Sequence, residues 1–130
     1  TVRYANFNEI KDLLIYDFNE ERNFNYRKIS IDKQAKHFAS FSSNIWQIHP
    51  FREGNTRTVA VFMIKYLRHL GYDVNNDIFK NNSTYFRNAL ALSNYSNYKK
   101  NIKPDFLYLT EFYNNLLYCN NELPKIKVYK

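Results

Sequence analysis

Apolar residues recur at steps of three and four along most of the chain, a spacing typical of helices that bury one face. The first run predicts a helix over residues 7–21, and the second predicts a helix over residues 31–48 with Ser30 as its cap. The second run is the longest, so we expect its helix at the centre of the fold. The apolar faces consist of Phe7, Ile10, Leu14 and Phe18 in the first helix, and of Ile31, Ala35, Phe38, Phe41, Ile45 and Ile48 in the second.

The same pattern continues through the second half of the chain. A third apolar run begins at Asn55 and stops at Gly71, a common helix-stop residue, and it predicts a helix buried on most sides. Another helix is expected after Asn82 or Ser83, and Pro104 opens a last one. With 2 Gly and 3 Pro, the chain has little of the turn chemistry that hairpins need. The sequence therefore predicts an all-α fold of about five helices, preceded by a short extended segment at the N-terminus.

Length and composition indicate a single domain. The chain has 130 residues, 45% of them hydrophobic; we place the domain at residues 1–118 and a polar, basic tail at residues 119–130. Cys119 is the only cysteine and cannot form an intramolecular disulfide. No apolar run reaches the ~20 residues that cross a bilayer. We therefore expect a cytoplasmic protein without membrane contacts. The start at Thr1 rather than Met suggests a processed or trimmed chain, so any upstream sequence that regulates it would not be seen here.

Reactive side chains concentrate in residues 49–58, where one buried helix ends and the next begins. A helix N-terminus presents unpaired N–H groups and the positive end of its dipole, so it binds anions such as phosphate. Gly54 lets the backbone approach such an anion, Asn55 can add an amide donor, and Arg57 can act as a forked cation. Together these residues predict a phosphate cradle.

Two more side chains of this segment suit chemistry at a phosphate. Glu53 is the hard oxygen ligand that Mg²⁺ accepts when substrate phosphates already hold it. An imidazole titrates near neutrality, which suits His49 to take a proton from an attacking hydroxyl. Taken singly, Glu53 could be a first-turn acid, and His37 and His69 are interpreted as structural only. The combination of base, metal ligand and cradle in one short segment is what indicates a site.

Residues 49–57, HPFREGNTR, resemble the motif of the Fic domain family, His-x-Phe-x-Asp/Glu-Gly-Asn-Gly/Lys-Arg-x-x-Arg. Six of the eight defined positions match, and the predicted flanking helices extend the resemblance from Thr1 to about Tyr118. The resemblance implies a small helical protein that moves AMP from ATP onto a Ser, Thr or Tyr hydroxyl of a target protein and releases pyrophosphate.

The resemblance also implies a role for each motif residue. His49 would be the general base, and Glu53 would hold Mg²⁺ on the ATP phosphates. The anion hole would be formed by Gly54 and Asn55, and Arg57 would steady the phosphates.

Fic domains also have a flap that binds the target by strand addition, and a pocket for the nucleotide base. Residues 1–4 resemble the trailing strand of such a flap, whose target-binding residues would be Val2, Arg3 and Tyr4. The base pocket would be built from the helix after the motif helix, by Tyr85, Phe86, Ser93 and Asn94. Aromatic residues at helical spacing are more often part of an ordinary core than contacts of a cofactor.

The sequence departs from the family pattern at two positions, Thr56 in place of Gly or Lys and Ala60 in place of the final Arg. The Thr56 methyl would narrow the cradle, while its hydroxyl could donate to a phosphate. Loss of the arginine removes a phosphate contact and the usual partner of the family's inhibitory glutamate. No Ser or Thr is followed four residues later by Glu, so an inhibitory helix would come from upstream or from a separate antitoxin. Phe51 would anchor the motif loop in the core.

Several functions stay open beside AMP transfer. A Doc-like protein kinase, or another phosphate transfer on the same scaffold, is the alternative within enzymes. A catalytically weak nucleotide-binding or interaction domain is a second alternative. The 19 Lys and Arg against 12 Asp and Glu give a charge of +7, and the cluster of Lys99, Lys100 and Lys103 suits nucleic acid. We rank nucleic-acid binding last, because it leaves residues 49–57 unexplained.

Overall fold

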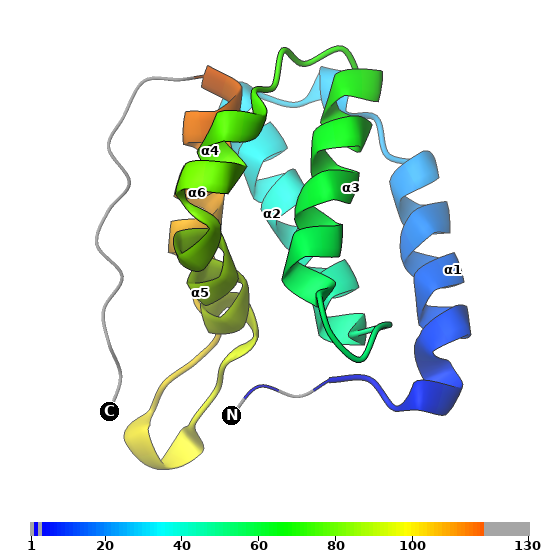
Figure 1. Cartoon of the computed structure of the whole chain (residues 1–130), viewed down its shortest axis with the longest axis vertical. Helices are drawn as coiled ribbons and strands as arrows, with labels where there is room; N and C mark the ends of the chain where they lie inside the picture. Colours follow the sequence, from blue (N-terminus) through cyan, green and yellow to red (C-terminus); the bar gives the residue numbers. More distant parts are fainter. Residues whose placement is uncertain (1, 3, 119–130) are drawn as a thin grey trace.

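The computed structural model describes Val2 and residues 4–118, and these residues form an all-α domain (Figure 1). The predicted fold class is therefore confirmed. The predicted tail at residues 119–130 lies outside the described residues. Short 3-10 helices lie at Phe7–Glu9, Tyr26–Lys28 and Tyr98–Lys100. The α-helices of the described part are α1 (Ile10–Arg22), α2 (Ile31–Ile48), α3 (Asn55–His69), α4 (Asn76–Asn81), α5 (Ser83–Asn94) and α6 (Leu107–Tyr118).

Helix α2 is the centre of the domain, as its long apolar run predicts. It packs against α1, α3, α5 and α6, and Figure 1 shows it between α1 and α3 on one side and the α4–α6 group on the other. Its residues face the interior on most sides, including the small side chains Ala35 and Ala39, which are fully buried and let neighbouring helices approach. The motif loop leaves from the end of α2, so it begins on the helix that packs against four others.

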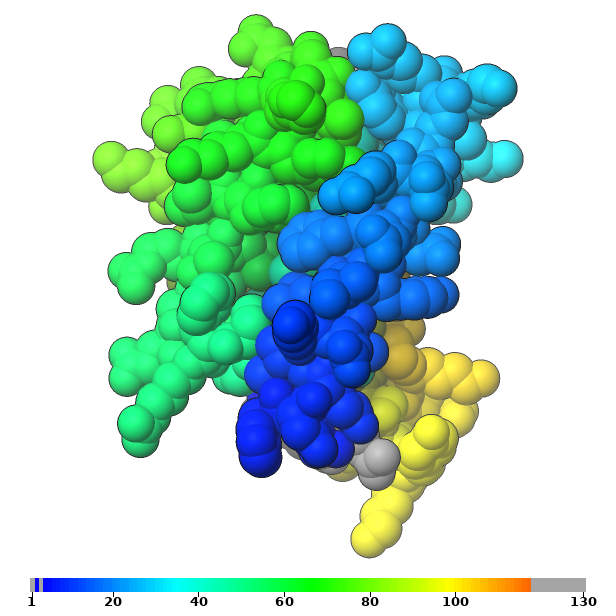
Figure 2. Space-filling view, turned by 90° about the vertical axis from the view of Figure 1, so that its right-hand side faces the viewer, coloured from blue at the N-terminus to red at the C-terminus, as the bar shows by residue number. Residues whose placement is uncertain are grey.

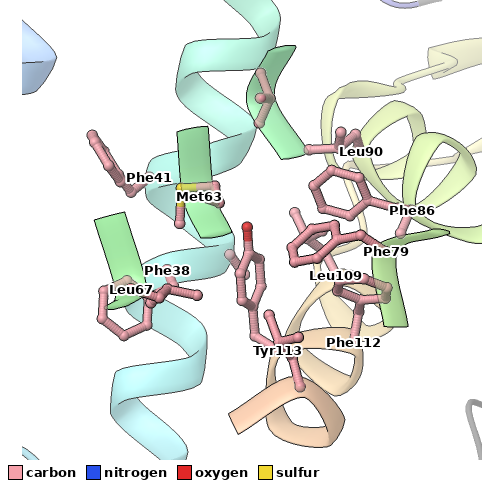
Figure 3. Close-up of a cluster of buried hydrophobic side chains, with 14 of the residues drawn as sticks. Phe38, Phe41, Met63, Leu67, Phe79, Phe86, Leu90, Leu109, Phe112 and Tyr113 are labelled. Atoms are coloured by element: carbon pink, nitrogen blue, oxygen red, sulfur yellow. The ribbon is translucent and has the colours of Figure 1, made fainter. Parts of the chain in front are cut away.

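The core is predominantly aromatic. Figure 3 shows the ring of Tyr113 between the side chains of α2 and α3 and a second group on α4, α5 and α6. In that second group the rings of Phe79 and Phe112 meet edge to face, with centroids 5.1 Å apart. The fully buried large side chains include Phe38, Met63, Leu67, Phe86, Leu90, Leu109, Phe112, Tyr113 and Leu116.

Three details of the helix predictions were wrong. The Phe7 side chain is 89% exposed, because residues 7–9 form a 3-10 turn that points away from the core and α1 begins only at Ile10. Ile31 is 54% exposed, since it occupies the first position of α2, beyond the neighbouring helices. Helix α4 was not predicted, because its six residues are too few to show a period, although Asn75 caps it by accepting from the Asp77 N–H.

Helix α1 is attached to the domain by a buried carboxylate. Glu21 accepts a hydrogen bond from His37 Nε2 on α2 at 2.6 Å and another from the Tyr66 hydroxyl on α3. Phe24 stacks on His37 with ring centroids 3.6 Å apart. Burial and the neighbouring Glu21 raise the pKa of Tyr66, so its proton stays available for this bond. His37 is thus structural, as predicted, and Figure 2 shows α1 lying along the surface beside α3.

The N-terminal segment crosses the end of α2 without forming a regular strand in its described part. Val2 makes an isolated antiparallel bridge with Tyr95, and the Ala5 N–H donates to the Gln47 carbonyl at 3.2 Å. The predicted flap strand is therefore reduced to a single bridge among the described residues, and Arg3 lies outside them. No helix in the described part combines the length and apolar character needed to span a membrane.

Candidate active site

The motif loop, residues 49–54, is bounded by two residues in the left-handed conformation. His49 ends α2 with φ 55°, and Gly54 precedes α3 with φ 74°. A left-handed residue costs roughly 1–2 kcal/mol when it carries a side chain, so glycine suits position 54 and strain is concentrated at His49. The loop thereby brings Asn55, the buried first residue of α3, into contact with His49 at the end of α2.

Asn55 fastens the loop from within. Its side-chain oxygen accepts from the Phe51 N–H at 3.0 Å, and its amide nitrogen donates to the Phe51 carbonyl at 2.7 Å. The side chain is buried, and its amide nitrogen also lies 3.3 Å from His49 Nε2. Both ends of the amide are thus engaged inside the loop, so the predicted contact of Asn55 with an anion would have to come from its backbone N–H. The expected role as amide donor to a phosphate stays a prediction.

The two hydrogen bonds between the Asn55 side chain and the Phe51 backbone determine which group of the Asn55 amide faces His49. The Phe51 N–H requires an oxygen and the Phe51 carbonyl requires an N–H, so the Asn55 amide can face His49 only with its N–H group. Nε2 of His49 can therefore accept a hydrogen bond from this N–H group in the tautomer whose proton is on Nδ1. Nδ1 is buried without a hydrogen-bond partner among the described residues.

The ring of Tyr4 covers the imidazole. Tyr4 and His49 lie with ring centroids 4.0 Å apart, and the Tyr4 ring also meets Trp46 edge to face at 5.5 Å. Of the two predicted flap residues that the structure describes, Tyr4 contacts His49, while Val2 pairs with Tyr95. Sequence reasoning placed Tyr4 on a flap but had no signal that its ring would stack on His49.

Thr56 is held by a tryptophan that sequence reasoning left out of the site. The indole N–H of Trp46, a buried residue of α2, donates to Thr56 Oγ1 at 3.1 Å. Because this hydroxyl accepts from Trp46, its own proton is free to point elsewhere, including toward an anion at the N-terminus of α3. The only available signal was the position of Trp46 one helical turn before His49.

Phe51 does not have the predicted place in the core. Its side chain is 51% exposed, and only its backbone is bound, by Asn55. The loop is held by hydrogen bonds to its main chain, so an apolar anchor is not required. Figure 2 shows the blue-green loop region projecting from the surface on one side of the dark-blue N-terminal segment.

Glu53 and Arg57 are both exposed at the cradle, and neither has a hydrogen bond or ion pair with a described residue. The Arg57 guanidinium lies over the start of α3, since a Cβ built on Gly54 would stand 3.2 Å from Nη2. No group of three or more metal-binding side chains occurs among the described residues. A lone, free carboxylate beside a helix N-terminus suits Mg²⁺ that arrives bound to phosphates. Glu53 therefore fits that ion but would not hold it alone.

A cavity of about 550 Å³ adjoins the cradle. Thr56 and Arg57 form part of its wall, and α4 and α5 supply the opposite side. Of the four residues predicted for the base pocket, only Phe86 lines this cavity. The floor and walls are made by Thr56, Arg57, Ala60, Val61, Ile64, Asn76, Phe79, Lys80, Ser83, Thr84, Phe86 and Arg87.

The other three predicted base-pocket residues take part in contacts inside the domain. Ser93 is buried and shares a hydrogen bond of 2.7 Å with the Ser43 hydroxyl, and Asn94 donates to the same hydroxyl at 3.1 Å. Tyr85 stacks near Phe112, and burial raises its pKa to about 12. The structure does not bring these three side chains to the cavity, and their contact with a base stays a prediction.

In this all-α domain a histidine, an exposed carboxylate and a helix N-terminus lie on one short loop, and phosphate- and nucleotide-transferring enzymes use groups of these kinds. The Fic/DOC family matches residues 2–67, just over half of the chain, and this match includes the whole motif loop. The chain belongs to the Fic/DOC family, whose members are typically transferases. Comparisons with curated proteins and with solved structures gave no significant match.

Proposed function

We propose that this protein is a protein adenylyltransferase, which moves AMP from ATP onto a Ser, Thr or Tyr hydroxyl of a target protein. The observation that carries the proposal is the position of the His49 imidazole, which ends α2 and contacts Asn55, the first residue of α3, through Nε2. A neutral imidazole next to an anion-binding helix end is suited to deprotonate a hydroxyl that attacks a bound phosphate. Family membership supports nucleotide transfer or a related activity on this site.

In the proposed reaction, the target hydroxyl oxygen forms a bond to the α-phosphorus of ATP. The bond from that phosphorus to the oxygen bridging the α- and β-phosphates breaks, and pyrophosphate leaves with the electron pair. The hydroxyl proton moves to Nε2 of His49. Backbone N–H groups at Gly54 and Asn55 and the guanidinium of Arg57 lower the energy of the negative charge on the phosphate oxygens.

Mg²⁺ bound to the nucleotide would neutralise phosphate charge, and Glu53 is the carboxylate that would hold it here. We place the target protein on the side of the N-terminal segment, since Tyr4 there borders His49. The Tyr4 ring would orient the imidazole and keep water away from one of its faces.

The test is incubation of the protein with Mg²⁺ and ATP labelled at either the α- or the γ-phosphate, in a lysate from which the protein itself can be separated. We expect α-label on protein, and no label with His49→Ala, because loss of a general base costs about 10²–10⁴-fold in rate. His69→Ala is the matched control, since His69 is an exposed histidine in the last turn of α3.

Three results would contradict the proposal. Label transferred only from the γ-phosphate indicates a protein kinase, the alternative activity on this scaffold. Binding of ATP without transfer of any label indicates a nucleotide-binding domain. Equal α-labelling by the parent and a folded His49→Ala variant means that His49 is not the base.

A further inference from the structure

The cavity beside the cradle has an unbalanced charge. Its lining contains three cations, Arg57 on α3, Lys80 on α4 and Arg87 on α5, and no carboxylate. Among the described residues, none of the three has an ion pair or hydrogen-bond partner. Three cations from three helices around one space repel one another unless an anion enters.

Arg68, which also lies on α3, is an arginine with a structural role. Its guanidinium donates two hydrogen bonds to the Val74 carbonyl and one, at 2.9 Å, to Asn76 Oδ1. Arg68 therefore holds the connection between α3 and α4 in place. Arg87 and Lys80 have no such task, although both lie close enough to line the same cavity as Arg57.

The cavity is continuous with the cradle, because Thr56 and Arg57 belong to both. One turn further along α3, the wall is formed by the small side chain of Ala60, at the position where the family motif has an arginine. The floor is apolar and includes Ile64, Phe79 and Phe86, which weakens the screening of charges above it. Negative groups extending from the cradle past Ala60 therefore meet the cations of the opposite wall.

We propose that Arg87, assisted by Lys80, binds the terminal phosphates of the nucleotide and replaces from α5 the arginine that is missing at position 60. This inference rests on the proposed function and deepens it, since it makes Arg87 a determinant of selectivity for nucleoside triphosphate over monophosphate. The guanidinium suits the task because its fork can bind two phosphate oxygens at once, whereas Lys80 contributes a point charge.

The experiment measures binding of ATP, ADP and AMP, each with Mg²⁺, to the parent protein and to Arg87→Ala. The single tryptophan, Trp46, donates to Thr56 at the cradle, so its fluorescence reports occupancy, and calorimetry provides an independent reading. We expect the affinity for ATP to fall about tenfold, and that for AMP to change less than about twofold, as loss of one charge-assisted contact predicts. Lys65→Ala is the control, an exposed cation on α3 that does not line the cavity.

A rescue variant separates this role from a general loss of positive charge. In Arg87→Ala combined with Ala60→Arg, the cation returns to the same cavity from the other wall, and we expect most of the ATP affinity to return. Arg87 is exposed, so its replacement should leave the fold intact, which circular dichroism checks.

The outcomes distinguish this inference from the proposed function. If Arg87→Ala binds ATP like the parent, or loses ATP and AMP affinity equally, Arg87 does not select the terminal phosphates, while α-labelling by the parent still supports AMP transfer. A parent that binds no nucleotide overturns both. Retained selectivity in Arg87→Ala together with its loss in Lys80→Ala would assign the role to Lys80 and contradict the proposal as stated.

Discussion

Thr56→Val tests whether the bond between Trp46 and Thr56 holds the cradle. Valine keeps the branched shape of threonine but removes the acceptor of the indole N–H, which donates to Thr56 Oγ1 at 3.1 Å. Trp46 is 3% exposed, so the N–H has little access to water as a replacement partner. A buried donor left unpaired costs about 1–3 kcal/mol, and we expect a loss of about 1–2 kcal/mol in the free energy of unfolding. Thr56→Ser keeps the hydroxyl and should retain most of the stability.

The assay is urea denaturation followed by circular dichroism, with Trp46 fluorescence as a second reading for the variants that keep the tryptophan. A double-mutant cycle with Trp46→Phe isolates the bond: in the phenylalanine background, Thr56→Val should cost less than about 0.5 kcal/mol, because the donor is already gone. If Thr56→Val is as stable as the parent, or costs the same in both backgrounds, the hydrogen bond does not stabilise the cradle. The expected narrowing of the cradle by the Thr56 methyl would then be its main effect.

Three further substitutions address other parts of the site and the fold. Tyr4→Ala should lower labelling activity with little change in stability, since Tyr4 is 45% exposed but covers His49. Tyr4→Phe should retain activity, and equal rates for the parent and both variants would show that the ring has no part in positioning His49. Gly54→Ala should cost about 1–2 kcal/mol of stability because φ is 74°, and an unchanged urea midpoint would refute this. Burial raises the pKa of Asp17 above its ordinary 3.8, so the ionised form opposes folding; Asp17→Asn should stabilise the protein at pH 7, an advantage that disappears below about pH 4. A pH-independent difference in unfolding free energy would contradict it.

The sequence predicts most of the helices because the helical spacing of apolar residues continues over long runs. The prediction for residues 31–48 coincides with α2, and Asn55 begins α3 as expected. The prediction fails where the run of helically spaced residues is short or its end is ambiguous. Helix α4 has six residues, too few turns to show the spacing, and Phe7 continues the apolar spacing of α1 although the chain there forms a 3-10 turn.

The candidate site could be located from the sequence, but its internal hydrogen bonds could not. The motif residues are adjacent in the chain, so their types and spacing indicate a phosphate site. Whether the Asn55 side chain points outward to an anion or inward to Phe51 depends on the left-handed turn at His49. The sequence does not predict this turn, because a residue other than glycine seldom adopts it. Likewise, Trp46 and Tyr4 reach the site through the packing of α2 and the N-terminal segment, and the sequence shows only that they lie nearby or on a flap.

The two departures from the family motif have different structural consequences. The Thr56 side chain has a partner close by, because its hydroxyl accepts a hydrogen bond from a tryptophan one turn before the loop. The arginine that is missing at position 60 is not replaced from α3, since no side chain on that helix other than Arg57 brings a cation to the cavity. The charge comes instead from Lys80 and Arg87, which a motif confined to residues 49–60 does not include. Selectivity for the nucleotide would therefore depend on how α4 and α5 pack against α3, and changes in that packing would alter triphosphate binding without touching the motif.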